Sequence, residues 1–162
     1  MLPVERLSGP ARGMMLVIAL ALGASGCSHT GAAPPPKLPK GTLSIETAHG
    51  RVSLDVQIAD TEQARRAGLM GRRVLAQTAG MAFLFDRPTQ VGFWMKDTLI
   101  PLSIAFWAPD GHVTSILDMT PCRAEHCPMY SPGITYIGAV EANRGFFRAH
   151  GVEMGDAVAI TR

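Results

Sequence analysis

The chain has 162 residues, of which 47% are hydrophobic and 17% are charged. This length fits one domain with a buried core, and the composition excludes a disordered chain and a heptad-based coiled coil. Four of the 15 basic residues and one of the 13 acidic residues precede residue 42, which leaves 11 basic and 12 acidic residues in the rest of the chain. A nearly neutral domain argues against nucleic-acid binding, because phosphate neutralisation needs a basic surface.

The first 26 residues have the layout of a signal peptide. Two arginines precede an apolar run at residues 14–22, which is too short to cross a bilayer as a helix and is followed by small residues. The segment from Ala24 to Cys27 (Ala-Ser-Gly-Cys) resembles a bacterial lipobox, although a leucine is usual where Ala24 stands. We expect residues 1–26 to be a lipoprotein-type signal peptide and Cys27 to be the lipidation site, with simple secretion as the alternative.

Residues 27–41 are rich in proline and poor in bulky apolar residues, and this composition predicts an extended tether. Acyl chains on Cys27 would hold the protein to a membrane without a spanning helix, since each buried methylene contributes about 0.8 kcal/mol. The expected location is therefore the periplasmic side of the cell envelope of a Gram-negative-type bacterium.

Residues 42–162 are expected to form a single β domain. Alternation of apolar and polar residues predicts a hairpin that turns at His49 and Gly50, and Asp60 with Gln63 resembles a capping pair for a short helix at 61–69. A second helix of one or two turns is expected at residues 144–150. Further strands are predicted at residues 80–85 (ended by Pro88), 91–94, 102–107, 112–119, 134–142 and 157–161. The expected fold is mainly β, a single-domain β-sandwich or distorted barrel with one or two short helices.

Cys122 and Cys127 are the cysteines that remain once Cys27 carries a lipid. An even pair in an exported domain predicts a disulfide, and no cofactor is expected. The alternative interpretation takes Cys122, His126, Cys127 and Met129 together as soft ligands for copper or zinc, or as a thiol-redox module.

The segment 93–98 concentrates aromatic, sulfur, cationic, carboxylate and hydroxyl groups within six residues. Strand alternation places Trp94 and Lys96 on one face, where they would receive a ring or an anion. The alternative is that Trp94 covers the edge of the core while Lys96 pairs with Asp97 or Glu141. The candidate ligand-binding residues are Trp94, Lys96, Asp97, Thr98, Tyr130 and Glu141.

The sequence lacks the motifs of common catalytic sites. There is no nucleophile elbow, no phosphate-binding loop and no zinc-protease motif, and no Ser-His-Asp triad or carboxylate pair can be assigned. No catalytic residue is therefore predicted. An unrecognised enzyme that uses Lys96, Asp97 or Glu141 as an acid or base remains as an alternative.

Several motifs together resemble one family. They are Gly68-Leu-Met70, Gly80-Met-Ala-Phe-Leu-Phe85, Phe93-Trp-Met-Lys96, Thr98-Leu-Ile-Pro-Leu102, Asp110-Gly111, Pro121-Cys122 with Cys127-Pro128 and Tyr130, and Gly145 ahead of Gly155-Asp156. From about Thr42 to Ile160 the chain resembles the domain of unknown function 192 family, also called uncharacterised protein family 0127. The resemblance implies a small, mainly β domain that is often exported and has no established reaction. This chain has Asp97 where the family usually has Asn, and Ser103 where it usually has Asp.

These observations predict a membrane-tethered, non-catalytic domain that binds an envelope component, for example a glycan strand, through the surface around Trp94 and Lys96. The expected partners are the membrane, reached through the N-terminal lipid, and that envelope component. The two alternatives are the soft-metal or redox module and the unrecognised enzyme.

Overall fold

The computed structural model describes residues 37–162. The expected signal peptide, the lipidation of Cys27 and most of the tether lie outside the described residues. None of the helices within 37–162 has the length and apolar character that spanning a membrane requires.

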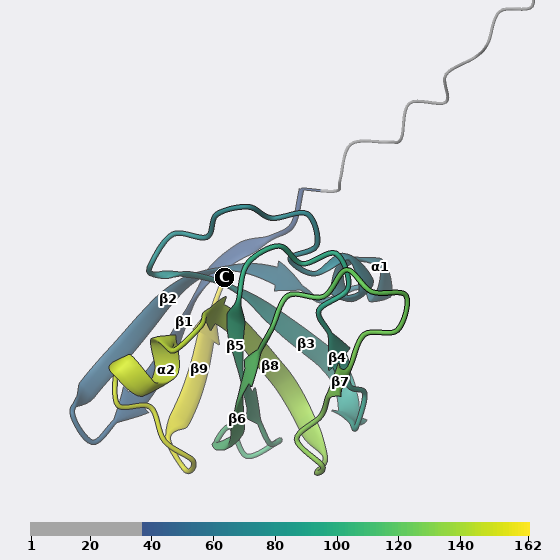
Figure 1. The fold of residues 1–162 in the computed structure, drawn as a ribbon. Coiled ribbons are helices and arrows are strands. Elements are labelled where there is room, and N and C mark those ends of the chain that lie inside the picture. Colours follow the sequence, from purple (N-terminus) through teal and green to yellow (C-terminus); the bar gives the residue numbers. More distant parts are fainter. Residues whose placement is uncertain (1–36) are drawn as a thin grey trace, which may run out of the picture. The chain divides into compact units, whose positions relative to one another are not determined.

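Seven strands form one sheet in the order β6-β5-β8-β3-β2-β1-β9 (Figure 1). Neighbouring strands are antiparallel except for β2 and β3, which are parallel. In chain order these strands are β1 (Lys40–Thr47), β2 (Gly50–Ala59), β3 (Ala79–Thr89), β5 (Leu102–Trp107), β6 (Val113–Met119), β8 (Tyr136–Asn143) and β9 (Ala157–Thr161).

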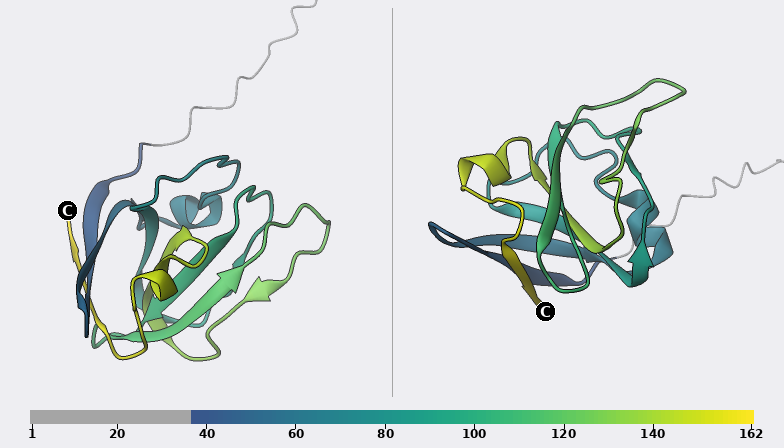
Figure 2. Two further views of the ribbon diagram at one scale, coloured as in Figure 1. Left: turned by 60° about the vertical axis from the view of Figure 1, so that its left-hand side comes forward. Right: turned by 90° about the horizontal axis from the view of Figure 1, so that it is seen from below.

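A smaller sheet and two short helices complete the fold. The small sheet pairs β4 (Phe93–Trp94) with β7 (Met129–Tyr130), and the helices are α1 (Glu62–Ala67) and α2 (Phe146–Ala149). The helix α1 and the small sheet lie on one side of the domain and α2 lies on the opposite side (Figures 1 and 2).

The large sheet is strongly bent, and the edge strands β6 and β9 approach each other at one end (Figure 2). There His112 forms an isolated bridge with Ala157, and the Val113 N–H donates to the carbonyl of Asp156. The sheet is not a closed barrel, since this contact joins the edges at one end within the described residues. The predicted mainly β, sandwich-like single domain is confirmed.

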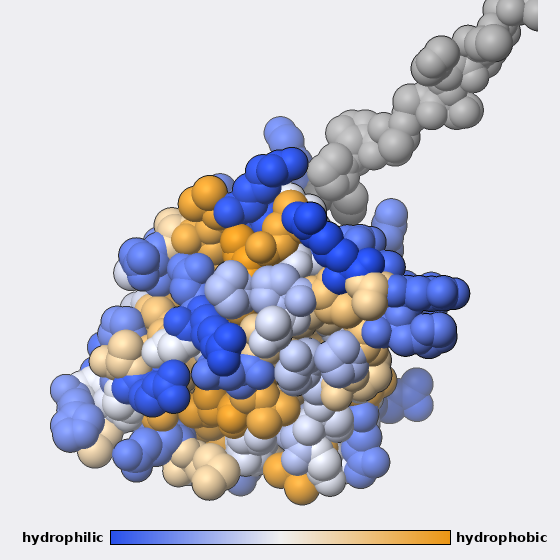
Figure 3. Space-filling view, in the orientation of Figure 1, coloured by the Kyte–Doolittle hydropathy of each residue, from blue (hydrophilic) through white to orange (hydrophobic). Residues whose placement is uncertain are grey.

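Two clusters of buried apolar side chains lie on the two faces of the sheet. The first cluster joins β1 and β2 to α2 and includes Leu43 and Phe147, while the second includes Phe83 and Met95 near α1 and β4. Strand β8 serves both, because its alternate residues point to opposite faces. On the outer surface drawn in Figure 3, hydrophobic patches lie among hydrophilic side chains.

The strand predicted to stop at Pro88 continues to Thr89. Pairing with β2 ends at Phe83, and pairing with β8 shifts between Leu84 and Thr89. Pro88 therefore lies in an irregular stretch where no ladder hydrogen bond needs its missing N–H, and this position tolerates proline.

The cap of α1 is Thr61 rather than Asp60. The Thr61 hydroxyl accepts a hydrogen bond from the Ala64 N–H at 3.2 Å. This bond satisfies one of the N–H groups that have no partner in the first turn of a helix. Asp60 instead pairs its carboxylate with Arg162 at 3.0 Å.

Candidate functional site

A pocket of about 710 Å³ opens between α1, the end of β3 and the small sheet β4–β7. This volume lies within the range of small-molecule sites in proteins. Four aromatic side chains contribute to its lining, namely Phe83, Phe85, Phe93 and Trp94. We call it the Glu141 pocket, after the carboxyl residue in its lining.

The rim of the Glu141 pocket exposes large apolar side chains. Within residues 37–162, seven large hydrophobic side chains are exposed, and four of them (Met70, Val91, Trp94 and Met129) line this pocket. Trp94 is 52% exposed and Met129 is 59% exposed. Single exposed apolar residues are ordinary, but a group gathered around a concavity is typical of a binding site.

Glu141 comes from the middle of the sheet, where β8 lies between β3 and β5. Its cross-strand neighbours are Met81 and Ile104, which are both buried. Glu141 itself is only 4% exposed, and no hydrogen bond to its carboxyl is found within the described residues. Its carboxyl is open to the pocket, because every fully buried side-chain nitrogen or oxygen among the described residues has a partner. Because burial disfavours the ionised form, the pKa of Glu141 is raised to about 8.

The cationic groups near the pocket mouth already have partners. Arg66 forms an ion pair with Glu62 at 2.5 Å. Arg65 donates to the carbonyls of Asp60 and Leu84, and its guanidinium lies 4.8 Å from the centre of the Phe85 ring. Neither guanidinium is left as an unpaired counter-charge for Glu141.

Thr98 reaches the pocket from a tight turn that begins at Met95. The Thr98 N–H donates to the Met95 carbonyl at 3.1 Å, and Asp97 between them has a φ of 54°. A turn with positive φ at its third position favours glycine or asparagine there. Two backbone hydrogen bonds of Asp97 hold the turn in place: its N–H donates to the Cys122 carbonyl, and its carbonyl accepts from the Gly71 N–H.

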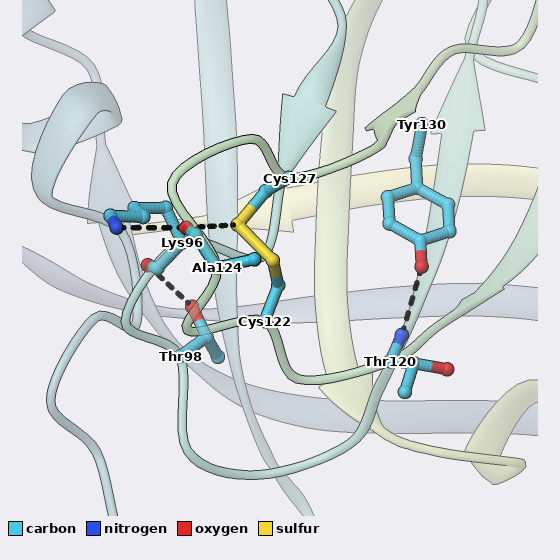
Figure 4. The surroundings of a disulfide bond; sticks show 7 residues. All are labelled: Lys96, Thr98, Thr120, Cys122, Ala124, Cys127 and Tyr130. Atoms are coloured by element: carbon cyan, nitrogen blue, oxygen red, sulfur yellow. Dashed lines mark hydrogen bonds between the residues drawn. A yellow bond between two sulfur atoms is a disulfide. The ribbon is translucent and has the colours of Figure 1, made fainter.

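The disulfide predicted from the sequence is present and adjoins this turn (Figure 4). Cys122 and Cys127 have Cα atoms 5.9 Å apart. The Lys96 ammonium donates to the carbonyl of Ala124, inside the disulfide loop, at 3.0 Å. The alternative that paired Lys96 with Asp97 or Glu141 is therefore wrong.

Tyr130 also supports the wall of the pocket. Strand β7, which contains Tyr130 and Met129, begins two residues after Cys127 and pairs with β4. The Tyr130 hydroxyl accepts a hydrogen bond from the Thr120 N–H at 3.1 Å (Figure 4). Disulfide, turn and small sheet thus form one continuous support for the side of the pocket that carries Trp94.

The alternative metal ligands are not gathered at one point in this oxidised form. Cys122 and Cys127 are bonded to each other, His126 is exposed in the loop between them, and Met129 lines the Glu141 pocket. Within the described part of the chain, no three His, Cys, Asp or Glu side chains come close enough to hold an ion together. A metal site at these residues requires the reduced cysteines.

A second buried polar group lies on β5. The Ser103 hydroxyl donates to the Asp118 carboxylate and accepts from the Gly145 N–H at 2.8 Å. Asp118 also faces Arg144 and Arg148, each at 3.5 Å. The hydrogen bond from Ser103, together with the two guanidiniums, lowers the pKa of Asp118 despite the opposing effect of burial.

The family model of domain of unknown function 192, described as Uncharacterized ACR, matches residues 44–160. The chain belongs to this family. Its resemblance to a domain of unknown function 192 protein, expected from the sequence motifs, is thus confirmed. No curated protein matches the chain.

Solved structures that share the fold of this domain of unknown function 192 protein include the following two. A candidate transcription regulator from Sinorhizobium meliloti 1021 has a TM-score of 0.72 and 30% identity, with 78% of this chain and 98% of that one covered. A protein of unknown function from Novosphingobium aromaticivorans DSM 12444 has a TM-score of 0.72 and 28% identity, with 80% of this chain and 91% of that one covered.

The candidate residues named from the sequence fall into two groups. Trp94, Thr98 and Glu141 line the pocket, whereas Lys96, Asp97 and Tyr130 support its wall. Sequence analysis missed the other aromatic and aliphatic lining residues. The i, i+2 spacing of two phenylalanines in β3 was an available signal for one wall, but nothing local in the sequence indicates that Met70 and Val91 meet at the rim.

Proposed function

We propose that this domain is a binding protein that holds a small, largely apolar molecule of the cell envelope in the Glu141 pocket. The observation that carries this proposal is the combination of an exposed apolar rim with a buried carboxyl that has no protein partner among the described residues. Pockets that pair apolar walls with few polar groups are the usual form of small-molecule sites.

The geometry favours an apolar ligand over the glycan strand considered from the sequence. Sugar recognition needs many hydrogen-bonding groups around an aromatic platform. Here Lys96 and Tyr130 direct their polar atoms to backbone groups of the wall. The rim combines Met70, Val91, Trp94 and Met129 with the Glu62–Arg66 ion pair, whose charged groups already bind each other. A glycan that competes for the pocket would correct this choice of ligand while keeping the binding function.

The envelope location rests on the leader sequence. The apolar run at 14–22 and the lipobox-like segment ending at Cys27 support anchoring by a lipid. The tether expected to reach residue 41 is two residues shorter, because β1 begins at Lys40 and both Lys40 and Gly41 pair with β2. A ligand drawn from the membrane or its surroundings would be within reach of a domain anchored in this way.

The test is binding of the neutral apolar dye N-phenyl-1-naphthylamine by the purified protein. We expect saturable binding to the wild type with one site per chain. Trp94→Ala should weaken it about tenfold or more, because loss of a large aromatic contact commonly costs more than 1 kcal/mol.

A matched pair of methionines provides the control. Met129 and Met154 are both exposed, but only Met129 lines the pocket. Met129→Ala should weaken dye binding and Met154→Ala should leave it unchanged. No saturable binding, or equal effects of the Trp94 and Met154 variants, would contradict the proposal.

A second candidate function is acid–base catalysis by Glu141. A carboxyl whose pKa is raised to about 8 is protonated at neutral pH and available to donate a proton to a bound molecule. Recovery of the ligand after long incubation separates the two functions. A binding protein returns the ligand unchanged, whereas an enzyme converts it in wild type and not in Glu141→Gln.

The soft-metal or redox module remains a third proposal. It depends on the state of Cys122 and Cys127, since a disulfide supplies no thiolate ligands. An intact mass two hydrogens short and without an adduct, measured on periplasmic protein purified without chelator, would contradict it. Retained thiol hydrogens or a bound ion would support it.

A further inference from the structure

We infer that the ligand of the Glu141 pocket carries an ammonium group, which pairs with the Glu141 carboxylate while its apolar part lies against the aromatic walls. This inference rests on the binding function proposed above and names the chemical class of the ligand.

The first argument is the charge balance within the pocket. Its lining contains four ionisable residues: Glu62, Arg65, Arg66 and Glu141. Glu62 and Arg66 neutralise each other, and Arg65 is occupied by two carbonyls and the ring of Phe85. Glu141 is the group left without an ion-pair or hydrogen-bond partner among the described residues, and burial alone accounts for its shifted pKa, so neither guanidinium supplies the charge that its carboxylate would need. A cationic donor on the ligand would supply it.

The second argument is the nature of the walls. Phe83 and Phe93 meet edge to face with ring centres 4.9 Å apart, and Trp94 follows directly in β4. Aromatic faces attract cations, and sites that surround an ammonium with aromatic rings are a recurring mode of recognition. An anionic ligand would gain nothing from the carboxyl of Glu141. To bind Arg65 or Arg66 it would have to compete with the partners that these guanidiniums already have.

The third argument concerns the hydrogen bond that Glu141 lacks. A buried carboxylate is costly without a donor, and an ammonium supplies both a donor and a charge. A neutral alcohol supplies only a hydrogen bond. An amine should therefore gain more from Glu141 than an alcohol with the same chain.

Proton balance gives the inference a second signature. Below pH 8, Glu141 is mostly protonated in the empty pocket, so pairing with an ammonium releases one proton to the buffer. The charged and polar residues that share the pocket lining with Glu141 are Glu62, Arg65 and Arg66 from α1 and Thr98 from the turn, while Met81 and Ile104 flank it within the sheet. Amine affinity should thus rise from pH 6 to pH 8.

The test is calorimetric titration of the purified protein with octan-1-amine, octan-1-ol and octanoate, which share one chain and differ in charge. At pH 8 we expect the amine to bind at least about tenfold more tightly than the alcohol, and octanoate to bind most weakly. Glu141→Gln should reduce the affinity for the amine to that for the alcohol and change alcohol binding less than about twofold. Glu46→Gln, an exposed and ion-paired carboxyl on β1 outside the pocket lining, is the matched control and should keep the preference.

Proton release by the wild type gives an answer that needs no variant. At pH 7, titrations in buffers of different ionisation enthalpy should report close to one proton released per amine bound and none per alcohol. Equal affinities for amine and alcohol, or a preference that survives Glu141→Gln, would overturn the inference. If the dye binds in a Trp94-dependent manner while the amine shows no preference or does not bind, the binding function stands and the ammonium assignment falls. Loss of dye binding as well would remove the proposed function itself.

Discussion

Glu141 and Ser103 are two buried polar residues on adjacent strands, and their surroundings are opposite. In the register of β5 and β8, Ser103 pairs with Ala142, the residue next to Glu141. Ser103 is 1% exposed and both donates and accepts a hydrogen bond. Glu141 is 4% exposed and has only apolar cross-strand neighbours. Burial of a polar group is costly unless it is hydrogen-bonded, so Ser103 stabilises the fold whereas Glu141 weakens it and remains available to a ligand.

The largest expected effect is on the pH dependence of stability, through Glu141. Its folded-state pKa of about 8 exceeds the ordinary value of 4.5, so the folded protein binds more protons than the unfolded chain between these two pH values. Stability should therefore fall as pH rises from about 4.5 to 8 and then level off. At 1.36 kcal/mol per pH unit the cost reaches up to about 5 kcal/mol.

Glu141→Gln removes the ionisation and should remove this cost. The variant should match wild type in urea unfolding near pH 4 and be more stable by several kcal/mol at pH 9. Glu62→Gln, an exposed carboxyl on the same pocket, should change stability by less than about 0.5 kcal/mol at either pH. If the free energy of unfolding changed with pH in the same way for the wild type and for Glu141→Gln, Glu141 would not be an unpaired buried carboxyl.

A smaller effect is expected at the satisfied site. Ser103→Ala leaves the Gly145 N–H without its acceptor and removes the main hydrogen bond that lowers the pKa of Asp118. We expect a loss of about 1–3 kcal/mol at pH 7, which is the usual cost of leaving a buried group unpaired.

The sign of the pH dependence at Ser103 is opposite to that at Glu141. A carboxyl with a lowered pKa stabilises the fold above its ordinary pKa, and that stability is lost as pH falls through the folded-state pKa. The penalty of Ser103→Ala, measured by urea unfolding, should therefore shrink at pH 3. Ser53→Ala, an exposed serine on β2, is the control and should have little effect at any pH. If the loss of stability in Ser103→Ala did not depend on pH, the hydrogen bond from Ser103 would not be what stabilises the ionised Asp118 carboxylate.

Features set by local patterns were predictable from the sequence. Period-two alternation marked the hairpin of β1 and β2, and the proline-flanked cysteine pair indicated the disulfide. Pro88 is an exception that depends on the tertiary structure. It is tolerated within β3 because neither β2 nor β8 pairs with the strand at that position.

The pocket itself could not be read from the sequence. Met70, Val91 and Met129 come from three separate segments and meet only because the segments that follow α1 and β3 and the small sheet surround one pocket. Glu141 was a candidate as a carboxylate within an apolar strand, but the sequence did not indicate that its neighbours would leave it without a partner. The alternation of residues along a strand determines which face of the sheet a side chain lies on. Whether that side chain finds a hydrogen-bond or ion-pair partner depends on every element that packs against the same face.

The smallest expected effects are at Asp97. Unlike Glu141 and Ser103, this polar residue makes its structural contacts through its backbone. It is exposed, has a φ of 54° and links the Thr98 turn to two neighbouring loops. Side chains other than asparagine, aspartate and glycine are disfavoured in this conformation. Asp97→Ala should lower the free energy of unfolding by about 1 kcal/mol, and Asp97→Asn should leave it within about 0.5 kcal/mol.

Ligand binding decides whether Asp97 has a further role. If the turn matters only for its shape, Asp97→Asn should bind N-phenyl-1-naphthylamine and octan-1-amine within about twofold of the wild type, whereas Trp94→Ala should weaken both. A change in amine affinity without a change in stability would mean that the Asp97 carboxylate contributes charge to the site. The contrast between the unpaired carboxyl of Glu141 and the fully hydrogen-bonded hydroxyl of Ser103 would then have to include a second acidic group, Asp97, at the pocket wall.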